Sequence, residues 1–154
     1  IMMVAKGIGG GFPLGAVLAT EDAASGMTAG THGSTYGGNP LGCAVGCPVM
    51  DNVTNPGFLA EAHPKAGLLR QKLEGLIDTH PEVFEEVRGS GLMLGLQCKV
   101  SNIDMVNAGY DNEVITVPAA DNVIRLLPPL TLSDEDIAQA LARLDKAATQ
   151  VANA

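Results

Sequence analysis

The residue with the clearest chemical potential is a lysine that follows an apolar segment and opens a glycine-rich loop. Lys6 comes directly after Ile1-Met2-Met3-Val4-Ala5, which predicts a short buried strand, and the loop that it opens reads KGIGGGFPLG. A lysine at a strand end can hold its amine in a cleft, where partial burial favours the neutral amine that Schiff-base chemistry requires. Glycines let the backbone approach a bulky ligand. The pattern indicates a covalent-binding lysine, or else a surface lysine in a flexible loop.

A nucleotide-binding loop is the other chemical interpretation of this segment. The P-loop places its lysine after the glycines and follows it with Ser or Thr, whereas Lys6 precedes the glycines here. The G-x-G-x-x-G spacing is not matched cleanly either. Both phosphate fingerprints are therefore disfavoured, although a nucleotide-binding domain that uses this loop stays open as an alternative.

A second glycine-rich segment, HGSTYGGNP at residues 32–40, carries two adjacent hydroxyl groups. Ser34 and Thr35 could donate hydrogen bonds to phosphate oxygens. Asn39 and Pro40 suit the cap and the first position of a helix, whose free N–H groups would favour an anion. An ST-turn that merely caps this helix is the local alternative. Pro48 predicts a kink or a break further along the helix.

Arg125 lies between apolar neighbours in a strand-like stretch, residues 123–127. A charged side chain in that position must either face solvent or pair with an anion. The planar guanidinium group fits a carboxylate with two parallel hydrogen bonds. The pattern therefore indicates a carboxylate-binding arginine, or else a solvent-facing residue on an edge strand.

The cysteines and histidines do not form a metal-binding pattern. Cys43 and Cys47 are four residues apart on the predicted helix, but no second pair of ligands accompanies them, so we expect small buried apolar residues and no metal. His63 and His80 are given no role. The odd number of cysteines, without a secretory signal, indicates reduced thiols and a cytoplasmic location.

Charge and hydropathy exclude several kinds of partner. The net charge of −8 argues against nucleic-acid binding, which needs clustered Lys and Arg. No basic amphipathic segment suggests a membrane surface, and no apolar run approaches the length of a membrane-spanning helix. We therefore expect neither a nucleic-acid nor a membrane partner.

The pattern of apolar residues predicts two regions of different fold class, joined by a helix. Residues 1–50 are typical of the end of an α/β domain, residues 51–80 of a linking helix, expected from about Pro56 to Thr79, and residues 81–154 of a small α+β domain. The apolar first residues indicate that the chain begins inside a domain. In the last part, strands are expected at residues 83–87, 92–100, 114–117 and 123–127. Ser133 is expected to cap a final helix, with Glu135 or Asp136 completing a capping box. The inward residues of this helix are expected to include Ile137, Leu141 and Leu144.

Four segments, in this order, resemble the class-III aminotransferases. Residues 5–16 (AKGIGGGFPLGA) resemble the cofactor-lysine loop of that family, and residues 32–41 (HGSTYGGNPL) its second phosphate loop. Residues 89–95 (GSGLMLG) are similar to a small-domain strand motif, and residues 121–130 (DNVIRLLPPL) to its substrate-arginine strand. The resemblance implies the C-terminal portion of a fold-type I transferase dependent on pyridoxal phosphate, made of the end of the large domain and the small domain.

The resemblance also implies a role for individual residues. Lys6 would hold pyridoxal phosphate as a Schiff base and then move a proton between substrate and cofactor. Thr35 would bind the cofactor phosphate in the site of a neighbouring subunit, which implies a homodimer. Ser34 would lie beside the substrate, and Arg125 would bind the substrate α-carboxylate.

Within the family, the likeness is greatest to members that act on N2-acetyl-L-ornithine. The implied reaction transfers its δ-amino group to 2-oxoglutarate, a step of arginine biosynthesis. Ornithine, succinylornithine or 4-aminobutyrate as the amino donor is the nearest alternative, because these relatives share most of the motifs. Family members are much longer, and the upstream part supplies the rest of the site. A truncated chain that acts only in dimerisation or binding, without turnover, is therefore the third possibility.

Overall fold

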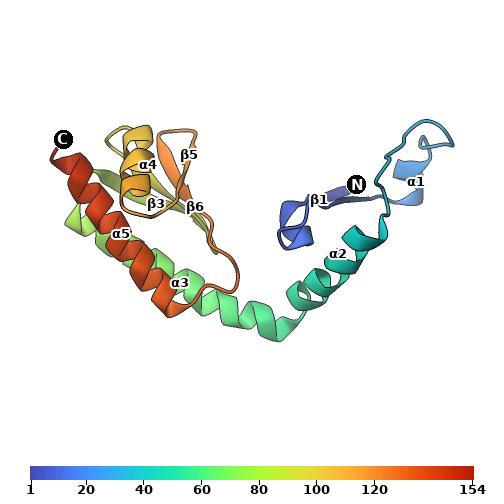
Figure 1. The fold of residues 1–154 in the computed structure, drawn as a ribbon, viewed down its shortest axis with the longest axis horizontal. Coiled ribbons are helices and arrows are strands. Elements are labelled where there is room, and N and C mark those ends of the chain that lie inside the picture. Colours follow the sequence, from blue (N-terminus) through green and yellow to red (C-terminus); the bar gives the residue numbers. More distant parts are fainter. The chain divides into compact units, whose positions relative to one another are not determined.

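The computed structural model describes residues 1–154, which divide into two compact units, Ile1–Phe58 and Leu59–Ala154 (Figure 1). The first unit has a two-stranded sheet and the second a four-stranded sheet, and each is accompanied by helices. The elements of the first unit are β1 (Met2–Ala5), the 3₁₀ helix η1 (Lys6–Gly9), β2 (Gly15–Leu18), α1 (Glu21–Ala24) and α2 (Pro40–Val53).

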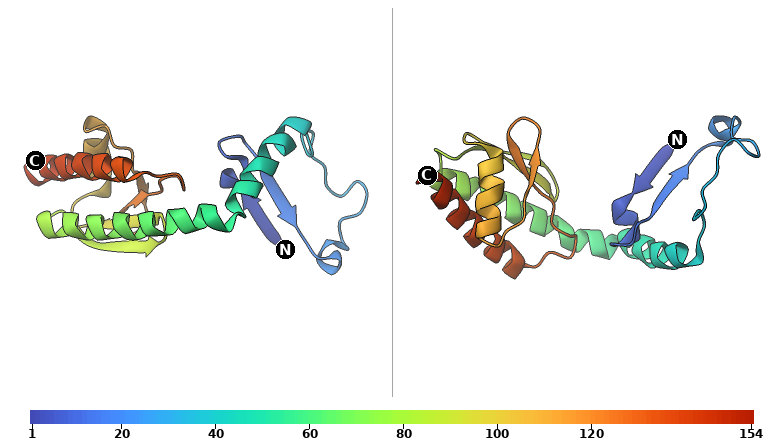
Figure 2. Two further views of the ribbon diagram at one scale, coloured as in Figure 1. Left: turned by 90° about the horizontal axis from the view of Figure 1, so that it is seen from below. Right: turned by 45° about the horizontal axis from the view of Figure 1, so that its top comes forward.

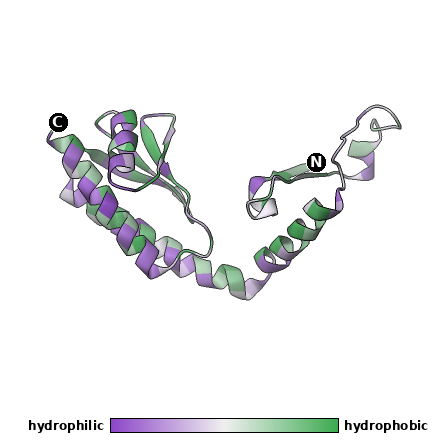
Figure 3. Ribbon diagram, viewed as in Figure 1, coloured by the Kyte–Doolittle hydropathy of each residue, from purple (hydrophilic) through white to green (hydrophobic).

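The hairpin of β1 and β2 confirms both predicted strands but not the burial of the first. The strands are antiparallel, with Met2 opposite Leu18 and Ala5 opposite Gly15. Met3 is 78% exposed and Val17 is 65% exposed, and Figure 3 shows that apolar residues continue along both strands. The prediction of a buried strand is wrong for this chain because the sheet has only two strands, so most of both its faces stays open.

Helix α2 begins as predicted and continues through its proline. Asn39 accepts a hydrogen bond from Gly42 N–H at 2.7 Å, and Pro40 occupies the first turn. The predicted break at Pro48 is wrong, since the helix extends to Val53. A proline removes one backbone hydrogen bond, whereas the bonds on either side remain. Asn52 adds one more, from its side-chain amide to the Pro48 carbonyl oxygen at 2.9 Å.

The cysteines of α2 are exposed, contrary to the prediction that they are buried. Cys43 and Cys47 both lie on the solvent side of the helix. The buried positions are Gly42 and Gly46, one residue earlier in each case. A Cβ at Gly46 would lie 2.7 Å from Leu14 Cδ2, so the loop after Lys6 packs too closely for a larger residue. The two cysteines do share one face of α2 as predicted, but the buried face is formed by Gly42 and Gly46.

The second unit combines one sheet with three helices, and its first helix begins in the preceding unit. The sheet is antiparallel with the strand order β3-β4-β6-β5. The elements are α3 (Pro56–Thr79), β3 (Phe84–Ser90), β4 (Met93–Cys98), α4 (Asn102–Asp111), β5 (Val117–Ala119), β6 (Val123–Leu126) and α5 (Asp134–Ala152).

One face of this sheet forms the core with the helices. Alternate residues of β4 and β6 point into it, and the unbroken α3 contributes a leucine stripe despite Pro64. Burial raises the pKa of the Cys98 thiol in this core to about 11. In Figure 2, α3 and α5 run side by side. The largest fully buried side chains are Phe84, Leu73, Leu94, Leu96, Met105, Ile124, Ile137, Leu144 and Val83.

One strand and one helix of the second unit differ from the elements predicted from the sequence. β5 covers Val117–Ala119 instead of residues 114–117, and it includes Pro118, which an edge strand tolerates because its outer N–H is not needed. α4 was not predicted, although Ser101 caps it by accepting from Asp104 N–H. β6 lies between β4 and β5, so Arg125 is not on an edge strand.

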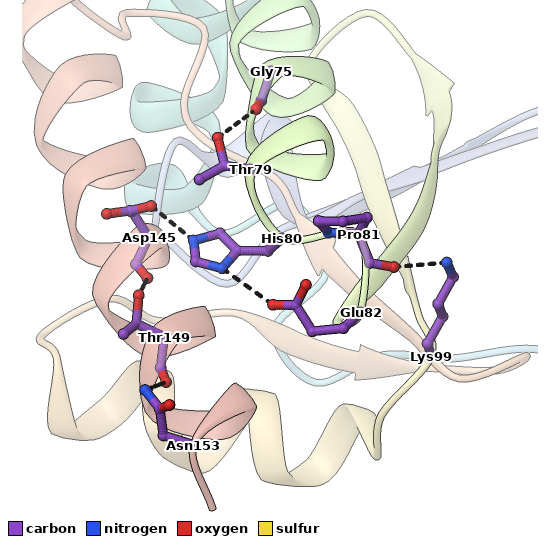
Figure 4. Close-up of polar contacts among 9 residues, drawn as sticks. All are labelled: Gly75, Thr79, His80, Pro81, Glu82, Lys99, Asp145, Thr149 and Asn153. Carbon is purple, nitrogen blue, oxygen red and sulfur yellow. Dashed lines mark hydrogen bonds and ion pairs between the residues drawn. The ribbon is translucent and has the colours of Figure 1, made fainter.

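His80, to which no role was given, joins the end of α3 to α5. The residue is only 7% exposed, and its Nε2 lies 2.8 Å from Asp145 Oδ1, as Figure 4 shows. Its Nδ1 lies 3.6 Å from Glu82 Oε1. Nearby, Lys99 donates to the Pro81 carbonyl oxygen at 2.6 Å. A buried polar side chain needs such partners, so His80 stabilises the packing of the second unit.

We predict that His80→Ala in the full-length protein lowers the free energy of unfolding by about 1–3 kcal/mol, because the variant loses a buried hydrogen bond and leaves a space. Chemical denaturation measures the effect. His63→Ala, at an exposed position of α3, is the matched control and should change stability by less than about 0.5 kcal/mol. Equal effects of the two substitutions would contradict this role.

The N-terminus of α5 forms the predicted capping box. Asp136 N–H donates to Ser133 Oγ at 3.1 Å, and Ser133 N–H donates to Asp136 Oδ2 at 3.0 Å. The Ser133 hydroxyl, and after it the Ser133 backbone N–H, hold the pKa of Asp136 below its ordinary value of 3.8. A lowered pKa stabilises the folded chain above the ordinary value, and this stabilisation is lost as the pH falls through the folded-state pKa.

We therefore predict that Ser133→Ala moves the pKa of Asp136 back toward 3.8, because the hydroxyl donor is removed. An NMR titration of the side-chain carboxyl measures the change. Loss of a serine cap also costs about 1 kcal/mol of stability at neutral pH. An unchanged pKa would show that the hydroxyl does not act on the carboxylate.

Candidate cofactor and substrate site

Lys6 occupies a constrained position at the end of β1. It opens the short helix η1 with a φ of 60°, in the left-handed region that residues other than glycine seldom adopt. Its backbone N–H donates to the Leu14 carbonyl oxygen at 3.2 Å, which closes the loop. Such a backbone geometry is enriched at functional sites. The position is therefore consistent with a reactive lysine.

The partial burial expected for Lys6 is not present in this chain. The residue is exposed, and its amine has no hydrogen-bond or ion-pair partner. The hairpin has no third strand, so nothing covers the strand end at which Lys6 lies. What the structure provides is an unengaged amine beside Gly7, where an added Cβ would meet no atom within 4 Å.

Part of the glycine-rich loop serves packing. A Cβ at Gly10, which has a φ of 55°, would lie 2.8 Å from Val49 Cγ2 on α2. Gly11, with a φ of 108°, has open space around it instead. The loop is therefore pressed against the second half of α2 on one side and accessible on the other.

Ser34 and Thr35 lie in the turn that precedes α2. A backbone hydrogen bond from Gly37 to the Ser34 carbonyl oxygen, at 3.3 Å, closes the turn. Both residues are exposed, and neither hydroxyl has a partner within the chain. The alternative that these hydroxyls cap the helix is wrong, because the Asn39 carboxamide does so.

The Lys6 loop and Thr35 lie at different points along α2. The loop that Lys6 opens packs against residues 46–49, in the middle of the helix, whereas Thr35 precedes Pro40 at its start. At about 1.5 Å per residue, the separation along the helix is on the order of 10 Å. The two predicted cofactor residues therefore do not contact each other within one copy of the chain.

Arg125 is the arginine in this chain that has no internal partner. It lies at the centre of β6, opposite Gly95 of β4 and Val117 of β5. Its neighbours Ile124 and Leu126 are buried, so its side chain points to the opposite face, where it is exposed. The other arginines, Arg70, Arg88 and Arg143, all pair with carboxylates. Arg125 is therefore free to bind an external anion.

A depression of about 180 Å³ adjoins Arg125 on this open face of the sheet. Three residues that lie opposite one another on neighbouring strands border this depression: Arg88 on β3, Gly95 on β4 and Arg125 on β6. A Cβ at Gly95 would lie 2.6 Å from Val123 Cγ1, so only glycine fits between the two arginines. The depression is lined by Arg88, Gly89, Met93, Leu94, Gly95, Ala119, Val123 and Arg125.

Arg88 was not recognised from the sequence, and its charge is already compensated. Its Nε lies 2.6 Å from Glu86 Oε1, and its Nη1 lies 4.0 Å from Asp121 Oδ2. The hydrogen bond that Arg88 Nε donates to Glu86 is the main reason that the pKa of Arg88 is raised above its ordinary value. Of the two arginines beside the depression, Arg125 is therefore the better anion site.

The other sequence-based site predictions concern metals and membranes. The chain has no group of three or more His, Cys, Asp or Glu residues placed to hold a metal ion. None of its helices combines the length and the apolar character needed to cross a bilayer.

The fold matches solved aminotransferases over nearly the whole chain. N-acetylornithine aminotransferase from Stenotrophomonas maltophilia superposes with a TM-score of 0.84 at 30% identity, over 99% of this chain and 40% of that one. Ornithine δ-aminotransferase from Plasmodium falciparum gives 0.83 at 30% identity, over 96% and 38%. The structure is thus the C-terminal portion of an α/β aminotransferase fold that binds pyridoxal phosphate, as the sequence predicted.

The sequence comparisons narrow this class to one family. The profile of "Aminotransferase class-III" matches residues 1–148. Acetylornithine aminotransferase from Rhodobacter capsulatus is 68% identical over 151 residues, which are 98% of this chain and 38% of that protein. The corresponding enzyme of Mesorhizobium japonicum is 54% identical over all of this chain and 39% of its own length. The chain belongs to the class-III aminotransferases and spans about two fifths of the length of these relatives.

Class-III aminotransferases depend on pyridoxal phosphate, and the residues present fit part of that cofactor's requirements. A carbonyl group needs a free amine, and Lys6 offers one without an internal partner. A phosphate group needs hydrogen-bond donors at a helix start, and the hydroxyl of Thr35 is unengaged just before α2. The side chains of Ser34 and Arg125 are likewise exposed and have no partner within the chain.

Proposed function

We propose that the protein of which this chain is part transfers the δ-amino group of N2-acetyl-L-ornithine to 2-oxoglutarate, giving N-acetylglutamate semialdehyde and glutamate. The geometric observation that carries this proposal is the unpaired Arg125 beside an apolar-floored depression. Both substrates carry a carboxylate that Arg125 can bind, although the α-carboxylate is far from the reacting Cδ of the donor and next to the reacting Cα of the acceptor. The names of the relatives at 68% and 54% identity favour acetylornithine as the donor, a step of arginine biosynthesis.

In this proposal each residue has a separate task. Pyridoxal phosphate, bound covalently through Lys6, supplies the electron sink that transamination needs. The Lys6 amine, once free, would take the proton from the carbon that bears the amino group and pass it to the carbon of the cofactor that carries the carbonyl group. Arg125 holds the α-carboxylate with two charge-assisted hydrogen bonds and so orients the substrate. Ser34 lies beside the substrate, and Thr35 donates to the cofactor phosphate.

A homodimer is part of the proposal. Lys6 and Thr35 lie at different points along α2 in one chain, and the family resemblance assigns Thr35 to the cofactor of a neighbouring subunit. The exposed apolar residues of the hairpin, such as Met3 and Val17, fit a surface that is covered in the complete protein. We further propose that residues 1–50 are the end of the large cofactor domain, residues 51–80 a linking helix and residues 81–154 the small domain.

Another amino donor is the second candidate. The match to an ornithine aminotransferase at a TM-score of 0.83 supports a related reaction on unacetylated ornithine. Comparing the kcat/KM of the full-length protein for N2-acetylornithine, ornithine, succinylornithine and 4-aminobutyrate discriminates these donors. Residues 1–154 alone are expected to have no activity, and turnover by that segment would contradict the proposed contribution of the upstream part.

We predict that Lys6→Ala in the full-length protein lowers kcat by at least about 10²–10⁴-fold, since the general acid–base group is lost. Borohydride reduction followed by mass spectrometry should place a phosphopyridoxyl group on Lys6 of the unmodified protein and on no residue of the variant. Lys72→Ala, at another exposed lysine, is the control and should retain activity and label. Label at a different lysine would refute the assignment.

We also predict that Arg125→Lys raises the KM for both N2-acetylornithine and 2-oxoglutarate by about 10–100-fold, because a bidentate hydrogen-bonded contact becomes a single charge contact. Steady-state kinetics with each substrate varied in turn measures the change. Arg143→Lys is the control, since Arg143 pairs with Glu113 elsewhere in the second unit. Unchanged KM values for Arg125→Lys would remove Arg125 from the substrate site.

A further inference from the structure

We infer that Asn102 and Asn122 act as a pair of positioning residues that hold the turn before β6 and thereby aim Arg125. This inference rests on the carboxylate-binding role proposed for Arg125. It concerns two residues that touch neither substrate nor cofactor in that proposal. The two asparagines are called the asparagine clamp here.

Asn122 ties the β5–β6 turn to the segment that follows β4. Its side-chain amide donates to the carbonyl oxygens of Cys98 and Val100, each at 2.7 Å. Its side-chain oxygen accepts from Asn102 N–H at 2.9 Å. The residue has a φ of 56°, which asparagine tolerates better than most residues do. One side chain therefore engages three backbone groups.

Asn102 holds the same turn from the other side. It is the first residue of α4, and its side-chain amide donates to the carbonyl oxygens of Ala119 and Val123, both at 3.1 Å. Ala119 and Val123 are the pair of residues that closes the β5–β6 hairpin. The asparagine clamp thus fixes both strands of the hairpin where the turn begins and ends.

The side-chain hydrogen bonds matter for the β5–β6 turn because β5 itself makes few backbone hydrogen bonds that would hold it. β5 has only three residues, lies at the sheet edge and contains Pro118, which donates no backbone hydrogen bond. Two further contacts reach Asp121 in the turn, one from Gln97 Nε2 to its carbonyl oxygen at 2.5 Å and the longer one from Arg88. Besides the backbone hydrogen bond from Cys98 N–H to the Asn122 carbonyl oxygen at 2.9 Å, the turn depends on these side-chain contacts.

The path from the asparagine clamp to Arg125 is short. Val123 and Arg125 are two residues apart on β6 and point to the same face, which places them about 7 Å apart along the strand. Val123 also lines the depression beside Arg125. A shift of the turn is transmitted along β6 to the guanidinium group and weakens the two hydrogen bonds by which it holds the substrate carboxylate.

The test uses the full-length protein with Asn122→Gly, which retains the positive φ and removes all three side-chain contacts. We expect the KM for N2-acetylornithine and for 2-oxoglutarate to rise by about tenfold or more while kcat changes by less than about threefold. Phosphopyridoxyl labelling of Lys6 should be unaffected. Should this variant fail to fold, Asn102→Ala replaces it: alanine suits a helix, and the substitution removes the two side-chain contacts to the hairpin while the Asn102 backbone N–H contact remains.

A matched control separates positioning from stability. Asn112 also donates two side-chain hydrogen bonds, to the Ala108 carbonyl oxygen and to Gln150, but it follows α4 and lies outside the hairpin. Asn112→Gly should lower the melting temperature without changing either KM. If Asn122→Gly and Asn112→Gly behave alike, with unchanged KM values, the inference is overturned.

A double-mutant cycle distinguishes this inference from the proposed function. If the asparagine clamp acts through Arg125, Asn122→Gly adds little to the KM of the Arg125→Lys variant, so the two effects are not additive. Fully additive effects would overturn the inference while leaving the role of Arg125 intact. An Arg125→Lys variant with unchanged KM values would instead contradict the proposed function itself.

Discussion

The alternation of buried and exposed residues along β6 is the constraint on which the candidate substrate site depends. Ile124 is fully buried and Leu126 is 9% exposed, so Arg125 between them has to face the other side of the sheet. The antiparallel pairing then sets Arg125 beside Gly95, with Arg88 one strand further. A shift by one residue would bring the apolar pair into solvent and the arginine into the core.

The free energies of the interactions show which of them determine the face of the sheet on which Arg125 lies and which only adjust its position. Burying an Ile or Leu side chain contributes about 1.5–3 kcal/mol, whereas a typical hydrogen bond contributes about 1 kcal/mol. The apolar pattern of β6 therefore selects the face on which Arg125 lies. The side-chain hydrogen bonds of Asn102 and Asn122 act on the smaller scale, on the placement of the turn. The orientation of a bound substrate depends on both the apolar burial and the side-chain hydrogen bonds, since a displacement of about 1 Å already affects the reaction rate.

The first unit is organised by a different constraint, the close approach of a loop to a helix. Gly10 and Gly46 allow the Lys6 loop and α2 to touch, and larger residues would collide there. This contact determines where Lys6 lies relative to the start of α2 and hence to Thr35. The exposed amine and hydroxyl, together with the exposed apolar hairpin, leave this unit with binding groups but without the covering that a finished active site has.

The sequence by itself determined the features that arise within a few residues. The caps at Asn39 and Ser133, the extent of α3 and the strand around Arg125 were predicted correctly, because capping and periodicity are local interactions. The four family motifs also identified Lys6, Ser34, Thr35 and Arg125 as the candidate residues. Only the tertiary structure decided the exposure of Cys43, the interior place of β6, and the partners of His80 and Asn122. Each of these depends on segments far apart in the chain, whose packing the local pattern does not encode.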